Sequence, residues 1–353
     1  MIENDIINWL EISESMKYID IYNSPTRVKF FRLIHVMMGF KSYGSFWYLL
    51  LKLFYFLQIM MLAINDISDT SDNTITLLKY ISNIFLINEY LSSESFYSLV
   101  ILVLSILTVI IIFVFIYIEI SINLGKFYIR LPVSILNYFN PLLIDYLIGP
   151  IIIMALLSTK CDDNNEHFLL HKKCFKDPTH IAVMLFAFIN LAFYVGYTFI
   201  LSIYYNEVGA INENKLSARL NCNYEFFVFI NKIVIFILSY FNEYYFPNNK
   251  LMRMIIQIYI CLSYTLFCVY CYHEVLHYTT TIDILHLYGN AFISWFDFCL
   301  ILRELLKFKE ITVLLIVGYI IIAIILYLLE DDRRDFLLTD FNIFQANSIT
   351  FLI

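Results

Sequence analysis

Residues 98–120 read SLVILVLSILTVIIIFVFIYIEI, and Glu119 is the only charged residue among them. An α-helix rises about 1.5 Å per residue, so roughly 20 such residues cross the ~30 Å hydrocarbon core of a bilayer. A surface helix of a soluble protein would show a polar face at helical spacing, and this stretch shows none. It therefore predicts a transmembrane helix.

The same pattern recurs along the whole chain. Apolar runs of similar length fall at 45–64, 96–122, 134–157, 179–204, 222–241, 254–273, 286–303 and 311–329. The seventh run carries His286, Asn290 and Asp297, which leaves open that it lies at the interface or folds back. We expect an all-α, polytopic integral membrane bundle of about eight transmembrane helices, or seven if that run does not span.

The composition supports a membrane protein. Of the 353 residues, 61% are hydrophobic and 15% are charged, whereas soluble domains are usually about 45–50% apolar and about 25% charged. The net charge of −7 supplies no basic surface for nucleic acid. The expected partner is the lipid bilayer, and membrane or cytosolic protein partners stay open.

Polar segments set the limits of the membrane domain. We expect a cytosolic N-terminal segment at 1–44, a multi-pass domain at 45–329 and a short polar, amphipathic tail at 330–353. The acidic start has the wrong order for a secretory signal peptide, and the basic block at 27–41 favours an N-terminus inside the cell. The segment 65–95 is acidic and amphipathic, which is typical of a surface helix.

The stretch CVYCYHEVLH at 268–277 contains HEVLH, which fits the HExxH pattern of zinc proteases. In that pattern His273 and His277 bind zinc from one helical face, and Glu274 activates water. A catalytic zinc needs a third protein ligand. The downstream candidates are His286, Asp297 and Glu304. Because none lies in a recognisable companion motif, we favour interfacial side chains at a helix end, with zinc as the alternative and no other cofactor.

The loop TKCDDNNEHFLLHKKCFKDP at 159–178 holds Cys161 and Cys174, with His167 and His171 between them. Such a set of side chains can bind a metal. With the N-terminus inside, however, this loop faces the oxidising side of the membrane, where disulfides form and persist. We therefore favour a Cys161–Cys174 disulfide over a zinc loop.

Among the ionisable side chains of the apolar runs, we single out Lys52, Asp145, Lys232 and Asp297 as groups placed in the membrane. Such groups are costly in lipid and mark a candidate functional site. Asp145 lies between Pro141 and Pro150, which free backbone carbonyls nearby. We expect Asp145 and Lys232 to form a buried pair or part of an ion path. The simpler alternatives are a structural ion pair, or a Lys52 side chain that reaches the surface.

Several stretches in order resemble the N-terminal membrane region of tiny macrocysts B-like proteins. They are LLLKLFYFLQIMMLAIND at 49–66, LLKYISNIFLINEYL at 77–91, LPVSILNYF at 131–139, GPIIIMALLSTKC at 149–161, the two-Cys loop, NEVGAINENKLSARLN at 206–221 and FFVFINKIVIFIL at 226–238. The resemblance spans roughly 45–330. It implies a sensory or signalling role at the plasma membrane, more than at an internal membrane. The PAS domain that follows the helices in that family does not occur in this sequence.

These observations favour a non-enzymatic membrane module of sensory or signalling type. The first alternative is an ion channel or transporter that uses the intramembrane charges. The second is a membrane zinc protease built on HEVLH. No other enzyme motif, such as a dinucleotide-binding or nucleoside triphosphate loop, occurs in the sequence, so we lean away from an enzyme.

Overall fold

The structure is a computed structural model. It describes residues 45–65, 94–124, 129, 131–162, 166–167, 170, 172–202, 223–246, 249–274, 280–306 and 313–329. The predicted surface helix at 65–95 and both terminal segments lie almost wholly outside these ranges.

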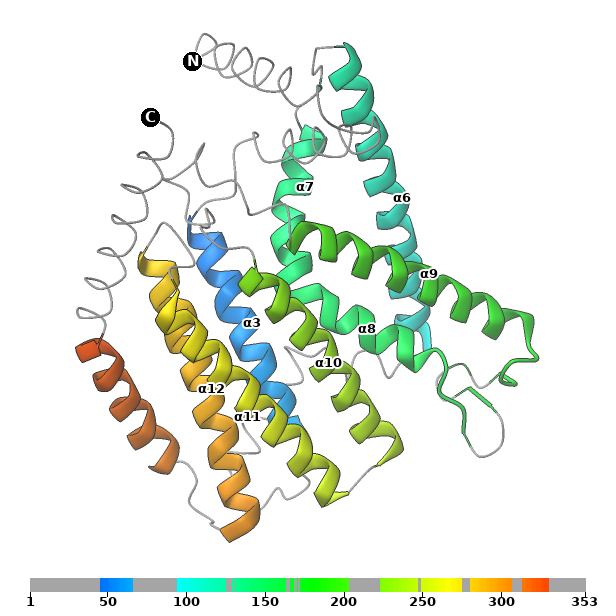
Figure 1. Ribbon diagram of the computed structural model, residues 1–353. Coiled ribbons are helices and arrows are strands. Elements are labelled where there is room, and N and C mark those ends of the chain that lie inside the picture. The colour runs from blue at the N-terminus through cyan, green and yellow to red at the C-terminus, as the bar shows by residue number, and fades with distance from the viewer. Residues whose placement is uncertain are drawn as a thin grey trace, which may run out of the picture. The chain divides into compact units, whose positions relative to one another are not determined.

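The described chain is helical, with no β-strand beyond two isolated bridges in the two-Cys loop. The helices are α3 (Ser45–Asn65), α6 (Glu94–Leu124), α7 (Leu131–Leu142), η1 (Leu143–Leu147), α8 (Ile148–Leu157), α9 (Pro178–Ile200), α10 (Asn223–Tyr245), α11 (Lys250–His273), α12 (Thr280–Leu306) and a last helix, Val313–Leu329. Figure 1 shows their order.

Seven helical spans among the described residues are long and apolar enough to cross a membrane, and Val313–Leu329 is a shorter apolar helix. The predicted polytopic helical bundle is therefore confirmed. The seventh apolar run forms α12, a continuous helix of 27 residues, so it neither breaks nor folds back within those bounds.

The third span is a helix with a π turn inside it. Pro141 lies near the end of α7, η1 is a π-helical turn, and α8 continues to Leu157. A proline lacks the N–H that an α-helix donates to the carbonyl four residues earlier. Ile148 donates its N–H to the carbonyl of Leu143, five residues earlier. The backbone around Asp145 therefore departs from the regular hydrogen-bond ladder.

The chain divides into two compact units. The described part of the first covers 105–124, 129 and 131–140, where the Tyr117 hydroxyl donates to the carbonyl of Ile129 and accepts its N–H, both at 2.8 Å. The second unit holds residues 94–104 of α6, residues 141–142 of α7 and the remaining helices. Within it α11 packs along α12, α10 packs on α8 and α11, and α3 packs on α12 and η1.

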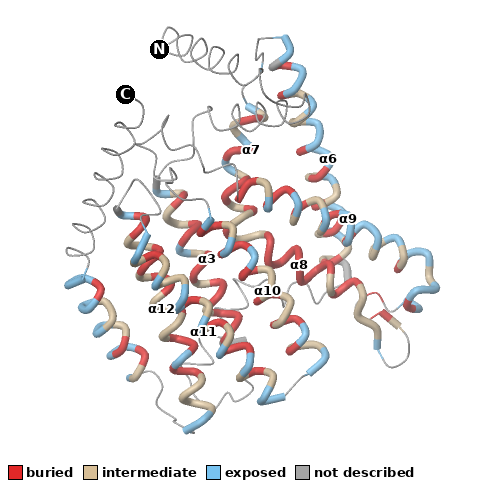
Figure 2. Tube along the Cα trace, in the orientation of Figure 1, coloured by how far each residue is buried: buried red, intermediate tan, exposed pale blue. Residues whose placement is uncertain are grey.

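Two glycines allow close helix packing inside the second unit. A Cβ added at Gly149 on α8 would overlap the ring of Phe236 on α10, and one added at Gly289 on α12 would overlap the ring of Phe56 on α3. Figure 2 shows that α8 is buried along most of its length. These contacts hold α3, α8, α10 and α12 around a common interior.

A buried charge network as the candidate functional site

The centre of the site is the ammonium group of Lys52 on α3. Its Nζ lies 2.9 Å from Oδ1 of Asp145 in η1 and 3.1 Å from Oε1 of Glu225 on α10. One ammonium group therefore donates hydrogen bonds to two carboxylates from two other helical segments. The ring of Tyr48 lies beside it, with 5.6 Å between Nζ and the ring centroid.

A second ammonium group binds the backbone of the π turn. Lys232 on α10 donates to the carbonyl of Asp145 at 2.6 Å and approaches that of Ile144 at 3.4 Å. The Ile144 carbonyl is available because Ile148, its α-helical donor, bonds to Leu143 instead. Lys232 thus binds the Asp145 carbonyl and approaches a second carbonyl that has lost its α-helical donor.

A proline of the third span likewise explains the hydrogen bond made by Gln58 of α3. Pro150 has no N–H to offer the carbonyl of Tyr146, four residues earlier. The side-chain Nε2 of Gln58 donates to that carbonyl at 3.2 Å. The carbonyls affected by the π turn and by Pro150 therefore lie near polar side chains from α10 and α3, as buried backbone groups require.

A polar extension leads from Glu225 to α12 and α11. His286 Nε2 lies 3.7 Å from Oε1 of Glu225, and His286 Nδ1 lies 3.2 Å from the hydroxyl of Tyr224. Asn290 donates to the Tyr224 hydroxyl at 2.8 Å and to the sulfur of Cys271 at 3.3 Å. The network therefore continues along the interface of α10, α11 and α12.

These groups are almost fully shielded from solvent. The exposed fraction is 2% for Lys52, 4% for Asp145, 3% for Glu225 and 1% for Lys232 and His286. Burying an ion costs several kcal/mol even after the protein relaxes. The two ammonium groups and two carboxylates balance in sign, which offsets part of this cost and leaves a network without net charge when His286 is neutral.

The pairing of Asp145 differs from the sequence expectation. The structure brings Lys52, Asp145 and Lys232 together, but the Asp145 carboxylate pairs with Lys52, and Lys232 binds the Asp145 backbone. Lys52 is buried, so it does not reach the surface. The choice of partner depends on the π turn, which presents the carbonyl and the carboxylate of Asp145 to different helices.

Sequence reasoning missed Glu225 as a member of this site and considered His286 as a polar residue of the seventh run and as a candidate zinc ligand, not as a partner of Glu225. Glu225 lies inside the fifth apolar run and seven residues before Lys232. Residues seven apart share a helical face, so this spacing was the available signal. Within the described ranges, Asp297 is not joined to the charge network by a hydrogen bond. It is fully buried on α12, and neither carboxylate oxygen has a hydrogen-bond partner in the described part of the chain.

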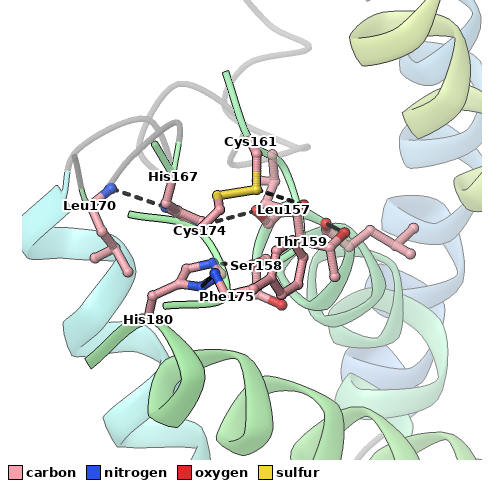
Figure 3. Close-up of a disulfide and its surroundings, with 10 residues drawn as sticks. Leu157, Ser158, Thr159, Cys161, His167, Leu170, Cys174, Phe175 and His180 are labelled. Carbon is pink, nitrogen blue, oxygen red and sulfur yellow. Dashed lines mark hydrogen bonds between the residues drawn. A yellow bond between two sulfur atoms is a disulfide. The ribbon is translucent and has the colours of Figure 1, made fainter. Parts of the chain in front are cut away.

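The predicted disulfide is present between Cys161 and Cys174, whose Cα atoms lie 6.2 Å apart. Figure 3 shows it beside two histidines at the end of α8. His171, the fourth member of the alternative zinc loop, lies outside the described residues. The bonded sulfurs are not available as thiolate ligands.

His167 and His180 cap the end of α8. Nε2 of His167 bonds the carbonyl of Leu157 at 3.1 Å, and Nε2 of His180 bonds that of Ser158 at 3.1 Å. Their Nδ1 atoms accept backbone N–H groups, of Leu170 at 3.0 Å and of Phe175 at 3.1 Å respectively. Each imidazole therefore carries a proton on Nε2 and donates it to a carbonyl at the end of α8, where the Leu157 carbonyl also accepts the N–H of Lys160 at 3.1 Å.

Two charged groups of this loop have shifted pKa values. Hydrogen bonds from the Thr179 hydroxyl and backbone N–H lower the pKa of Asp177, which caps the start of α9. Burial lowers the pKa of Lys160, whose Nζ lies 4.1 Å from the ring centroid of Tyr244 on α10. The loop is thus tied to both α9 and α10.

The zinc hypothesis requires residues 273–277 (HEVLH) to be helical, because only then do His273 and His277 lie on one helical face. α11 ends at His273, and Glu274 adopts an extended backbone with φ −120° and ψ 139°. His277 lies outside the described residues. Among the described residues no group of three His, Cys, Asp or Glu side chains is arranged to hold a metal ion. Zinc binding at this motif stays a hypothesis.

Comparison with known proteins yields no relative. No family model matches the sequence, and no curated protein and no solved structure matches it significantly. The chemistry of the site is therefore argued from its own residues.

Proposed function

We propose that the protein translocates protons across its membrane, as a channel or a transporter, with Asp145 and Glu225 as protonation sites. The observation that supports this proposal is the single Lys52 ammonium shared by two buried carboxylates from η1 and α10. Intramembrane carboxylates paired with cations are typical of proton relays.

Protonation of either carboxylate changes the balance of the network. Lys52 and Lys232 would then share one negative charge, and the interior would carry a net positive charge. Because an uncompensated charge is costly at low dielectric, the helices gain stability by opening the site to water. The π turn and its flanking prolines supply a point where the third span can bend.

Stability alone does not account for such a network. Well-packed apolar side chains of similar volume often hold a protein together as well as a buried ion pair, or better. The groups also come from three separate helical segments, so that a proton bound at one of them alters contacts between helices. We therefore assign the network to function, with packing as its secondary effect.

The test is a charge-displacement measurement on purified protein in liposomes adsorbed on a solid-supported membrane. A jump to acidic pH is expected to give a current, transient for a coupled transporter and sustained for a channel. Asp145→Asn and Glu225→Gln should abolish it, because the amide cannot bind the proton. Asp162→Asn, at an exposed loop residue, is the matched control and should keep it.

Absence of a current from the unmutated protein would overturn the proposal. A current that survives in both network variants would also overturn it, because the protons would then cross without Asp145 or Glu225. The three variants are compared only after size-exclusion chromatography shows equal monodispersity.

A sensory or signalling module is the second candidate, favoured by the position of α8. This helix begins beside the π turn that holds Asp145 and ends at the His167 and His180 caps of the disulfide loop. The hydroxyl of Tyr240 on α10 also bonds the carbonyl of Leu156 at 2.9 Å. The disulfide loop and the charge network are therefore connected through a single helix, α8, so that a structural change in the loop reaches the network through it.

Hydrogen exchange tests this second candidate. Reduction of the disulfide should change the amide protection of the first turns of α10, where Glu225 lies, if the loop signals to the network. Unchanged protection there would exclude this route. The resemblance to tiny macrocysts B-like proteins supports a plasma-membrane location, which imaging of a tagged full chain would check.

A further inference from the structure

A line of polar residues runs along one face of α12, which is buried except at Glu304. Asn290, Asp297 and Glu304 lie four, eleven and eighteen residues after His286. At about 100° per residue all four fall within roughly 40° of one another around the helix. At about 1.5 Å per residue they span roughly 27 Å, close to the thickness of the hydrocarbon core.

The facing helix carries the same spacing. Gln257, Tyr264 and Cys271 lie four, eleven and eighteen residues after Arg253 on α11, and all four are buried, with exposed fractions of 4% or less. The two lines meet near their ends. Arg253 Nη1 lies 3.5 Å from Glu304 Oε1, and Asn290 donates to Cys271 at 3.3 Å. They therefore form one polar seam between α11 and α12.

Asp297 lies between these two contacts and is 0% exposed. Neither of its oxygens, and neither side-chain polar atom of Gln257, has a hydrogen-bond partner among the described residues. An ionised carboxylate without a partner is untenable in an apolar interior, where the group takes up a proton instead. Its electrostatic neighbours include Cys261 and Tyr264 on α11 and Tyr319 on the last helix.

The seam also connects to the charge network in the middle of the bundle. The hydroxyl of Tyr264 lies 2.6 Å from that of Tyr55 on α3. The ammonium of Lys232 lies 5.2 Å from the centroid of the Tyr55 ring. Each tyrosine hydroxyl can donate and accept a hydrogen bond, so the Tyr55–Tyr264 pair places polar groups between the seam and the ring that Lys232 contacts.

We propose that Asp297 is a second proton-binding site, which carries protons between the Lys52 network and the Arg253–Glu304 end of the seam. The inference rests on the proposed function and names a further residue of the same path. In each cycle the Asp297 carboxylic acid releases one proton toward Glu304 and takes one up from the side of the network. No other bond forms or breaks, and the residue returns to its starting state.

Infrared spectroscopy of the purified protein in liposomes tests the protonation state directly. A protonated carboxyl in an apolar site gives a C=O band distinct from that of a carboxylate and shifted by deuterium exchange. This band should be present at neutral pH, disappear in Asp297→Asn and persist in the control Asp162→Asn. If the spectrum of Asp297→Asn is the same as that of the unmutated protein, the inference is contradicted.

The current measurement separates this inference from the proposed function. Asp297→Asn is expected to lower the proton current by about 100-fold, the usual contribution of a positioned proton-transfer group, and Asp297→Glu should retain most of it. A normal current in Asp297→Asn would refute the role of Asp297 while leaving the Lys52 network intact. If the unmutated protein carries no current but has the infrared band, the proposed function and the proton-carrying role of Asp297 are both overturned, and the band shows only that Asp297 holds a proton.

Discussion

The ammonium of Lys52 lies 2.9 Å from Oδ1 of Asp145, although 93 residues separate the two in the sequence. This contact joins α3 to the π turn of the third span. Because Glu225 on α10 shares the same ammonium group, three segments that are distant in the chain meet at a single side chain. The stability of the bundle and its response to protons should both depend on it.

Replacing Lys52 by Met should destabilise the protein strongly. The variant keeps much of the side-chain volume but leaves two carboxylates buried without their cation, and breaking a buried pair costs about 3–5 kcal/mol. The thermal melting temperature in detergent measures the loss. Glu225→Gln in the same chain should recover part of it, and a Lys52→Met protein as stable as the unmutated one would contradict the assigned burial.

Gly149→Ala should destabilise the contact between α8 and α10. The added methyl group meets the ring of Phe236, and overpacking of this kind typically costs about 1–3 kcal/mol. Gly196→Ala on α9 is the matched control, because a Cβ there meets nothing within 4 Å and alanine favours a helix. Equal melting temperatures for the two variants would show that the helices are not packed as described.

Loss of the disulfide should loosen the loop between α8 and α9. Cys161 and Cys174 are 13 residues apart, and closure of a loop of that order stabilises a protein by roughly 3 kcal/mol. A double Cys→Ala variant should melt at lower temperature, and reducing agent should lower the melting temperature of the unmutated protein only. Labelling of both cysteines in the unreduced, denatured protein would disprove the bond.

His180→Phe should destabilise the end of α8 while keeping an aromatic ring. The change removes the donor to Ser158 and the acceptor for Phe175, and each buried polar group left without a partner costs about 1–3 kcal/mol. Hydrogen exchange should show faster exchange at the N–H of Phe175. His273→Phe, at an exposed residue, serves as the control and should leave that amide protected.

The pH dependence of the α9 cap has a defined sign. Because Thr179 lowers the pKa of Asp177, the cap stabilises the folded state above the unfolded pKa of about 3.9, and this contribution is lost as pH falls through the lower folded value. Asp177→Asn keeps a capping side chain and removes this dependence. Melting curves at neutral and acidic pH compare the two, and high salt should reduce the difference at this exposed site.

Much of the architecture was predictable because the signals are local. Each of the eight apolar runs corresponds to a helical segment, as the bounds of α10 and α12 illustrate, since hydropathy over about 20 residues depends on no distant part of the chain. Cys161 and Cys174 lie in one short loop, so their pairing needed little knowledge of the fold. The partner of Asp145 was not predictable in the same way.

The sequence by itself determined which segments are apolar enough for a membrane and which charges those segments carry, and it favoured the pairing of Cys161 with Cys174 over a zinc loop. Only the tertiary structure decided that Lys52 takes the Asp145 carboxylate, that Lys232 binds the backbone of the π turn, and that Glu225 and His286 join them. The reason is physical: spacing along a helix fixes which residues share a face, whereas contacts between helices depend on how the faces pack. The π turn at Asp145 rotates that residue out of the regular register, and the folded bundle selects its partners.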